Sequence, residues 1–174
     1  MQGGAPARRP AGGRHPGVVR DDDPEDRLRR LGLTLPSPPP ALAHYELAVR
    51  TGSLLFLAGH APLRDGEQMY VGKVGREWSE ADGYDAARLT ALNMLATLEQ
   101  ELGDLRRIRR IVKLFGMVNC TEQFTRVPDV MNGASDLFIE VFGEAGRHAR
   151  SAVGMQQLHY GMAIEIEGVF EVGT

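Results

Sequence analysis

The sequence is short of several residue types, and each shortage excludes a class of protein. Its 174 residues include a single cysteine, Cys120, so no disulfide can form within the chain and a reducing compartment is expected. No segment approaches the run of about 18 apolar residues that a membrane-spanning helix needs. The formal charge of -3 supplies no basic field, which argues against a general nucleic-acid-binding protein. We therefore expect a cytoplasmic protein with no membrane segment.

Metal and phosphate motifs are missing too. The histidines His44, His60 and His159 form no pair at helical spacing and join no cysteine at a zinc-like spacing. The glycine-flanked segment 72–75 lacks the spacing and the Ser or Thr of a phosphate-binding loop. Cys120 could serve as a nucleophile only beside a paired base, and the sequence shows none. We predict no bound metal and no cofactor.

Length and composition indicate one domain behind a tail. With 43% hydrophobic residues, a chain of 174 residues suffices for one proper core. Residues 1–23 are rich in glycine, proline and arginine and hold almost nothing that could offset the entropy of ordering, so we expect a disordered tail. Residues 24–174 are expected to form the single domain, beginning with a short helix over 24–33.

Alternating and apolar runs predict the first strands. Residues 45–49 and 54–58 flank a polar turn and are expected to form a hairpin. An Asp-Gly pair at 65–66 marks a further turn. The run 108–118 is dense in β-branched and apolar residues, which predicts a central strand that is buried on both faces apart from Lys113.

Capping residues predict two long helices. Ser79 forms a capping box with Asp82, and apolar residues recur at helical spacing until Gly103. Pro128 opens a second helix, and Asn132 points away from its inner stripe. The members of that stripe are Val130, Ala134, Leu137 and Val141. The order of strands and helices argues for an α+β fold with two helices on one face of a mixed sheet.

The end of the chain predicts a strand pair. Residues 150–158 and 162–172 flank a turn, and the second segment carries apolar residues on one face and glutamates on the other. Pairing through a two-residue loop would place Arg150 on the same face as Glu165, about 20 Å away. One small ligand cannot bridge that distance within a single chain, so a site that uses both residues would need two subunits.

Several stretches resemble one known family. Residues 150–153 (Arg-Ser-Ala-Val) and the Ile-Glu-Ile-Glu run at 164–167 resemble the C-terminal signature of the RidA family, also called YjgF or L-PSP endoribonuclease-like proteins. Tyr45, a strand containing Gly59 and a helix containing Asn132 follow in family order. The sequence is most similar to a longer, less characterised branch of that family.

The resemblance covers residues 36–172 and implies an architecture. This is the chorismate-mutase-like fold, with two helices packed on one face of a mixed sheet, assembled as a homotrimer whose sheets form a central β-barrel. A cyclic trimer uses heterologous interfaces, which bring different surfaces of two subunits together. The predicted distance between Arg150 and Glu165 also requires two subunits for a site that uses both residues.

The resemblance also implies roles for individual residues. Arg150 would hold a substrate carboxylate, since a guanidinium fork matches a carboxylate, and Glu165 would orient or activate water. Tyr45 would line the cleft, Gly59 would let the backbone approach the ligand, and Asn132 would face either solvent or the cleft of a neighbouring subunit. Plainer roles are also open for these residues: an interface salt bridge for Arg150, a solvated or interface position for Glu165, packing for the Tyr45 ring and a bend of the strand at Gly59.

Several positions depart from the family pattern, among them Ala43-His44 in place of Gly-Pro before Tyr45 and His60 in place of glutamine after Gly59. Ala152 stands where the better-known deaminases of the family have cysteine, and His159 stands where proline usually follows the leucine. We therefore expect a reshaped pocket. Arg147 and His148 match no family role and are interpreted as polar loop residues.

The leading hypothesis is an imine or enamine deaminase that hydrolyses reactive 2-imino or enamino acids to 2-keto acids and ammonia in a cleft between subunits. Two alternatives stand beside it: a non-catalytic module that binds a small carboxylate, and pathway-specific hydrolysis or cyclisation in specialised metabolism. The ribonuclease label of the family is weakened by the negative net charge. The expected partners are other copies of the chain and a small imine or enamine metabolite that carries a carboxylate.

Overall fold

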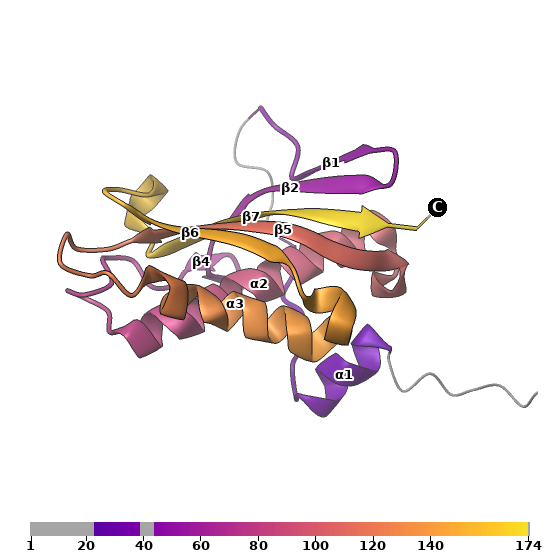
Figure 1. Ribbon diagram of the computed structural model, residues 1–174, viewed down its shortest axis with the longest axis horizontal. Helices are drawn as coiled ribbons and strands as arrows, with labels where there is room; N and C mark the ends of the chain where they lie inside the picture. The colour runs from indigo at the N-terminus through magenta and orange to yellow at the C-terminus, as the bar shows by residue number, and fades with distance from the viewer. Residues whose placement is uncertain (1–22, 39–43, 174) are drawn as a thin grey trace, which may run out of the picture.

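Two long helices cover one face of a five-stranded sheet in the described residues (Figure 1). The structure is a computed structural model and describes residues 23–38 and 44–173. The predicted disordered tail, residues 1–23, lies outside the described residues except for Asp23. The Asp23 side chain caps the first helix by accepting from the Glu25 amide at 3.0 Å.

The strands and the two long helices follow the order expected from the sequence. In the described residues the elements, with η for a 3-10 helix, are α1 (Pro24–Arg30), β1 (Ala48–Thr51), β2 (Leu54–His60), β3 (Leu63–Arg64), β4 (Glu67–Gln68), α2 (Glu80–Leu102), η1 (Leu105–Arg107), β5 (Ile108–Asn119), α3 (Val127–Phe142), η2 (Gly143–Gly146), β6 (Ala149–Met155), η3 (His159–Gly161) and β7 (Ile164–Val172). The main sheet has the order β1-β2-β7-β5-β6, in which only β5 and β6 run parallel. The predicted α+β fold with a mixed sheet is confirmed. None of the described helices has the length and hydrophobicity needed to span a bilayer.

Both long helices begin where their capping residues predict. The Ser79 hydroxyl accepts from the Asp82 amide at 3.2 Å, and the Asp82 carboxylate accepts from the Ser79 amide at 2.9 Å. Gly103 ends α2 in the left-handed conformation, at φ 71°, which costs glycine nothing sterically. Pro128 lies in the first turn of α3, where its missing N–H is not needed.

The expected pairing of the last two strands is wrong. β5 lies between them: Arg150 of β6 pairs with Leu114 of β5, and Glu165 of β7 pairs with Met117 of β5. Consecutive strands often form hairpins, but here α3 makes a crossover that brings β6 parallel to β5. β7 then pairs with β5 on one side and β2 on the other, so both of its edges form backbone hydrogen bonds within the sheet.

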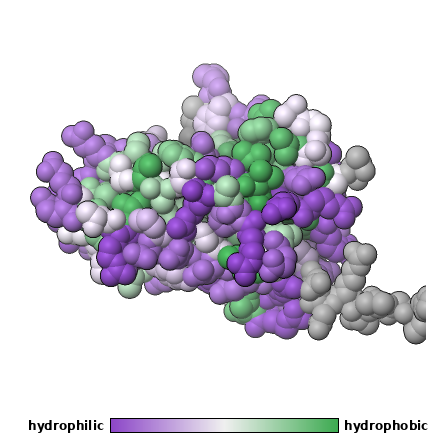
Figure 2. Space-filling model, viewed as in Figure 1, coloured by the Kyte–Doolittle hydropathy of each residue, from purple (hydrophilic) through white to green (hydrophobic). Residues whose placement is uncertain are grey.

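The sheet is covered on one face and open on the other within the described chain. Along β7, Ile164 and Phe170 are fully buried whereas Glu167 is exposed, which confirms the predicted alternation. The prediction that β5 is buried on both faces is wrong, because Arg110 and Val112 are exposed. Helices cover only the other face. Figure 2 shows hydrophobic side chains gathered over the strands in the upper part of the view, above a largely hydrophilic helical side.

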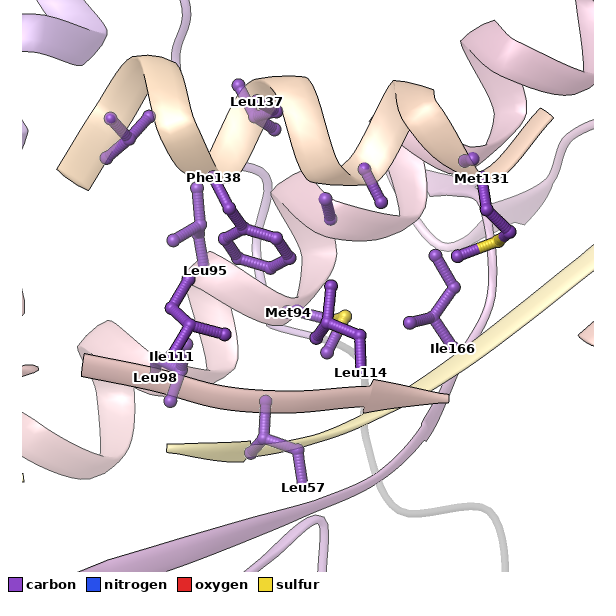
Figure 3. Packing of buried hydrophobic residues seen from close by; sticks show 14 of the residues in the cluster. Leu57, Met94, Leu95, Leu98, Ile111, Leu114, Met131, Leu137, Phe138 and Ile166 are labelled. Carbon is purple, nitrogen blue, oxygen red and sulfur yellow. The ribbon is translucent and has the colours of Figure 1, made fainter. Parts of the chain in front are cut away.

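The core between sheet and helices fixes how α3 lies over the strands. Leu114 of β5, Met94 of α2 and Phe138 of α3 meet there and are fully buried (Figure 3). Burying a side chain of this kind contributes about 1.5–3 kcal/mol. The two helices also approach closely, because a Cβ at Gly133 would lie 2.0 Å from the Tyr84 carbonyl oxygen. Since α3 cannot shift without opening this core, polar side chains on its flank toward β6 are held in fixed positions.

A buried histidine joins the sheet to α2. His60, at the end of β2, is 2% exposed, and its Nδ1 lies 2.8 Å from the Ala58 carbonyl oxygen. A carbonyl oxygen can only accept, so Nδ1 carries the proton and Nε2 accepts from the Thr97 hydroxyl at 2.8 Å. Burial lowers the pKa of His60 from its usual 6.5, and the neutral ring satisfies both contacts.

The free energy of unfolding should fall as the pH drops below the usual imidazole value of 6.5. The reason is that unfolded His60 takes up a proton there, whereas the folded protein does not until its lowered pKa is reached. His60→Gln should flatten this dependence in urea unfolding measured from about pH 8 to pH 5, the range in which histidine titrates. Part of the slope should remain, because burial also lowers the pKa of His148.

His44→Gln provides the control, because His44 is an exposed histidine in the segment before β1. It should keep the wild-type slope. Identical slopes for wild type and His60→Gln would contradict the assignment of the buried neutral ring.

Candidate functional site

The guanidinium of Arg150 is held by three neutral acceptors on α3. Its Nη1 donates to Asn132 Oδ1 at 3.0 Å and to Ser135 Oγ at 2.9 Å, and its Nη2 donates to the Pro128 carbonyl at 3.1 Å. Arg150 reaches α3 because its strand position pairs with Leu114, whose side chain faces the helices. Arg150 and Asn132, both expected at the site from the sequence, are thus brought together.

No carboxylate among the described residues forms an ion pair with Arg150. Burial lowers the pKa of Arg150, while the more distant Asp136 and Asp129 raise it. Both acids have other partners: Asp136 accepts from the Tyr84 hydroxyl and Asp129 pairs with an arginine. Within the described chain, Nε–H and one Nη2–H of Arg150 also lack an acceptor. Two donors on a partly buried guanidinium suit an incoming carboxylate.

His148 fixes the hydrogen-bonding direction of Ser135, one of the three acceptors that hold Arg150. His148 Nδ1 lies 2.7 Å from the Gly146 carbonyl oxygen, which can only accept, so Nδ1 carries the proton. His148 Nε2 then accepts from the Ser135 hydroxyl at 3.0 Å, which leaves the serine oxygen free to accept from Arg150. Burial lowers the pKa of His148, and the Arg150 charge lowers it further. His148 lies in the loop before β6, as expected, and its ring also fixes the direction of a hydrogen bond to Arg150.

The carboxylate of Glu165 lies in a second cluster. A Cβ at Gly59 would lie 2.0 Å from Glu165 Oε1, so the glutamate occupies space that only glycine leaves open. Gly59 lies in a bulge of β2, since the register between β2 and β7 shifts between Leu57 and His60. Glu165 Oε2 also lies 3.1 Å from Nδ1 of His159. The glutamate side chain is only 22% exposed as a result.

Tyr45 makes no hydrogen bond through its hydroxyl within the described chain. It is 43% exposed and precedes β1, so the predicted strand start at residue 45 is too early. The Ala58 amide donates to the Leu47 carbonyl, which continues the ladder beyond β1. The segment before β1 therefore runs along the end of β2 that contains Gly59.

The two clusters lie on opposite faces of the sheet. Arg150 pairs with Leu114 on the helix-covered side, whereas Glu165 pairs with Met117 on the open side. The expectation that Arg150 and Glu165 share a face is wrong, because it assumed that their strands are neighbours. A single chain brings Arg150 to Asn132, and Glu165 to Gly59, but does not bring the two pairs together.

Three residues of these clusters were not selected from the sequence. Ser135 follows Asn132 by three positions on a helix, a spacing that places both on one face and could have indicated it. His148 precedes Arg150 by two positions, the spacing of one face in an extended segment. His159 had no such signal beyond its departure from the family pattern, since its contact with Glu165 depends on the shape of the turn.

Two helices packed on one face of a mixed sheet with this topology define the chorismate-mutase-like class of folds. Residues 25–159 match the family described as "YjgF/chorismate mutase-like, putative endoribonuclease". The chain therefore belongs to the YjgF family, and the resemblance to RidA proteins noted in the sequence is confirmed.

Several known proteins are similar in sequence to this chain over most of its length. TCP17 from Trypanosoma cruzi is 40% identical over 148 residues, which are 84% of this chain and 92% of that protein. The crystal structure of Atu1372, a protein of unknown function from Agrobacterium tumefaciens, is 41% identical with a TM-score of 0.81, covering 86% of this chain and 92% of that one. A Shewanella oneidensis MR-1 protein with the same endoribonuclease description is 37% identical with a TM-score of 0.84, covering 86% and 99%.

Gly59→Ala should conflict with Glu165 and with little else. The added methyl would force the Glu165 side chain out of its position, so Gly59→Ala and Glu165→Ala should couple by about 1 kcal/mol in a double-mutant cycle. The cycle is measured by urea unfolding of wild type, both single variants and the double variant. Gly59→Ala combined with Glu167→Ala, an exposed glutamate on the same face, should be additive. Additivity with Glu165→Ala would contradict the close contact.

Proposed function

We propose that the protein hydrolyses reactive 2-imino and enamino acids to 2-keto acids and ammonia in clefts between its subunits. The observation that carries this proposal is the Arg150 guanidinium, which is partly buried, oriented by three neutral acceptors and without an ion-pair partner in the described chain. A desolvated cation in this state favours an anionic ligand. Membership of the YjgF family supports an enzymatic role.

Arg150 is proposed to hold the carboxylate of the substrate. Asn132, Ser135 and the Pro128 carbonyl occupy three of its N–H groups and fix the plane of the guanidinium. The remaining Nε–H and Nη2–H would donate to the two carboxylate oxygens. Because the arginine is already oriented, little side-chain entropy is lost when the substrate binds.

Glu165 is proposed to position the water that attacks the imine carbon. Its carboxylate is held between Gly59 and His159, and an anchored carboxylate can fix a water molecule by accepting its hydrogen bond. Tyr45 and Gly59, at the same end of β2, would line this part of the cleft. Such imines also hydrolyse without a catalyst, so a modest acceleration suffices.

The cleft is proposed to form between subunits of a homotrimer. Arg150 and Glu165 lie on opposite faces of one sheet, so a ligand that contacts both needs two copies of the chain. The open face of the sheet also carries an apolar row across three strands, formed by the paired residues Val49, Phe56 and Val169. Val49 is 55% and Phe56 is 42% exposed in one copy, and packing the sheets around a central barrel would bury them.

Arg150→Ala should lose most of the acceleration of imino acid hydrolysis while the protein stays folded. Removing one partner of a desolvated ion pair costs about 2–5 kcal/mol, so kcat/KM should fall by about 100-fold. The assay measures keto acid and ammonia released from a freshly generated panel of 2-imino acids. Arg147→Ala is the matched control, since Arg147 is an exposed arginine that pairs with Glu144 at 3.0 Å.

Full activity of Arg150→Ala would overturn the carboxylate clamp. Tight binding of small carboxylates by the wild type without any turnover would instead identify a non-catalytic binding module.

Phe56→Glu should prevent assembly through the open face. A glutamate in the centre of the apolar row would have to be desolvated at the interface, so light scattering should report a monomer in place of a trimer. Glu171→Gln, on the same face near the sheet end, should remain trimeric. A trimeric Phe56→Glu variant would show that the open face is not the interface.

A further inference from the structure

We propose that His159 is the catalytic residue that transfers protons in this reaction, with Glu165 as the carboxylate that positions it. The assignment rests on the proposed imine hydrolysis and adds to the part of Glu165 in it: besides holding the water by a hydrogen bond, Glu165 would position the imidazole. Glu165 would not accept the proton from water itself. It would set the tautomer and the direction of the imidazole ring.

The contact between the two side chains determines which histidine nitrogen can act. His159 Nδ1 lies 3.1 Å from Glu165 Oε2, and an ionised carboxylate can only accept, so Nδ1 carries a proton. In the neutral ring Nε2 is then left with a free lone pair. No described residue bonds to Nε2. The histidine is also the outer member of the pair, with 39% of its side chain exposed against 22% for the glutamate.

Other residues pack against both Glu165 and His159. The Glu165 side chain packs against the backbone at Gly59, where a Cβ would lie 2.0 Å from Oε1 and 2.9 Å from Cδ. The His159 ring packs edge-on against Tyr160, with ring centroids 5.5 Å apart. Tyr160 has a φ of 50°, a left-handed conformation that costs a residue with a side chain about 1–2 kcal/mol. The turn thus holds a strained backbone at the residue next to the imidazole.

Exposed ion pairs are common and contribute only about 0–1 kcal/mol, so the contact alone does not define a site. Here the glutamate side chain is 22% exposed, the glycine beneath it leaves room for no other side chain, and Nε2 of the ring has no hydrogen-bond partner among the described residues. A carboxylate that orients an imidazole through Nδ1–H and leaves Nε2 free is the arrangement that general-base catalysis requires.

The proposed steps balance for an iminium substrate. His159 Nε2 takes a proton from water as the water oxygen bonds to the imine carbon, and the C=N π electrons move to nitrogen to give a neutral carbinolamine. The imidazolium then returns its proton to the amine nitrogen. The C–N bond breaks to release ammonia, the hydroxyl oxygen forms the C=O bond, and the hydroxyl proton passes to solvent. Enamino acids enter the same sequence after they take up a proton from solvent at the β-carbon, which gives the iminium.

The test compares turnover of freshly generated 2-imino acids by wild type, His159→Ala and Glu165→Gln. His159→Ala should lower kcat by about 100-fold, the contribution typical of a general base. Added imidazole should restore part of that activity in proportion to its concentration, because it fits the space of the missing ring. Glu165→Gln retains the His159 ring and should gain nothing from imidazole, and Glu167→Gln is the control on the same strand.

Ring nitrogen NMR shifts of His159 provide a readout independent of turnover. The wild type should show the tautomer with the proton on Nδ1, and Glu165→Ala should lose this preference whereas Glu167→Ala keeps it.

The outcomes separate the two proposals. If wild type accelerates no imine, the proposed function fails and the assignment of His159 fails with it. If wild type is active and His159→Ala is equally active, only the assignment of His159 is overturned. Lost activity that imidazole does not restore would make His159 a structural residue and would also overturn the assignment.

Discussion

The burial of one sheet face beneath α2 and α3 is the constraint on which the rest of the structure depends. The helices cover one side of the strands, so side chains alternate between a dry core and an open surface. Arg150 faces the helices and is oriented by polar groups of α3. Glu165 faces the open side and is oriented by Gly59 and His159. The same alternation that builds the core therefore divides the candidate site into two halves.

In each half, neighbouring groups hold the candidate site residue in place. Neutral acceptors and a histidine whose burial lowers its pKa fix the guanidinium without neutralising it. A carboxylate in place of Ser135 or Asn132 would hold Arg150 equally firmly but would compete with any anionic ligand. In the other half, Gly59 leaves open the space that the Glu165 side chain fills, and His159 contacts the carboxylate of Glu165. Orientation without neutralisation is what an anion-binding arginine requires.

Family membership explains the fold, whereas the departures from the family pattern concern the surroundings of Glu165. The match over residues 25–159 supports the fold and covers Arg150, whereas Glu165 lies beyond the matched range. His159, where the family usually has proline, contacts Glu165 directly. The imidazole adds a ring with a donor and an acceptor nitrogen beside this carboxylate, which changes the hydrogen bonds that the carboxylate can make. The chemistry of this protein can therefore differ from that of relatives that share its fold.

The sequence by itself determined the features that depend on neighbours along the chain: the capping box at Ser79, the glycine at the end of α2, the buried stripe of α3 and the alternation along β7. It could not decide that β5 lies between β6 and β7, because strand partners are chosen by contacts between distant segments and a hairpin satisfies the same local pattern. That choice placed Arg150 and Glu165 on opposite faces. It also set the turn that brings His159 to Glu165, a contact that only the tertiary structure decides because it depends on a bulge in β2 and a left-handed Tyr160.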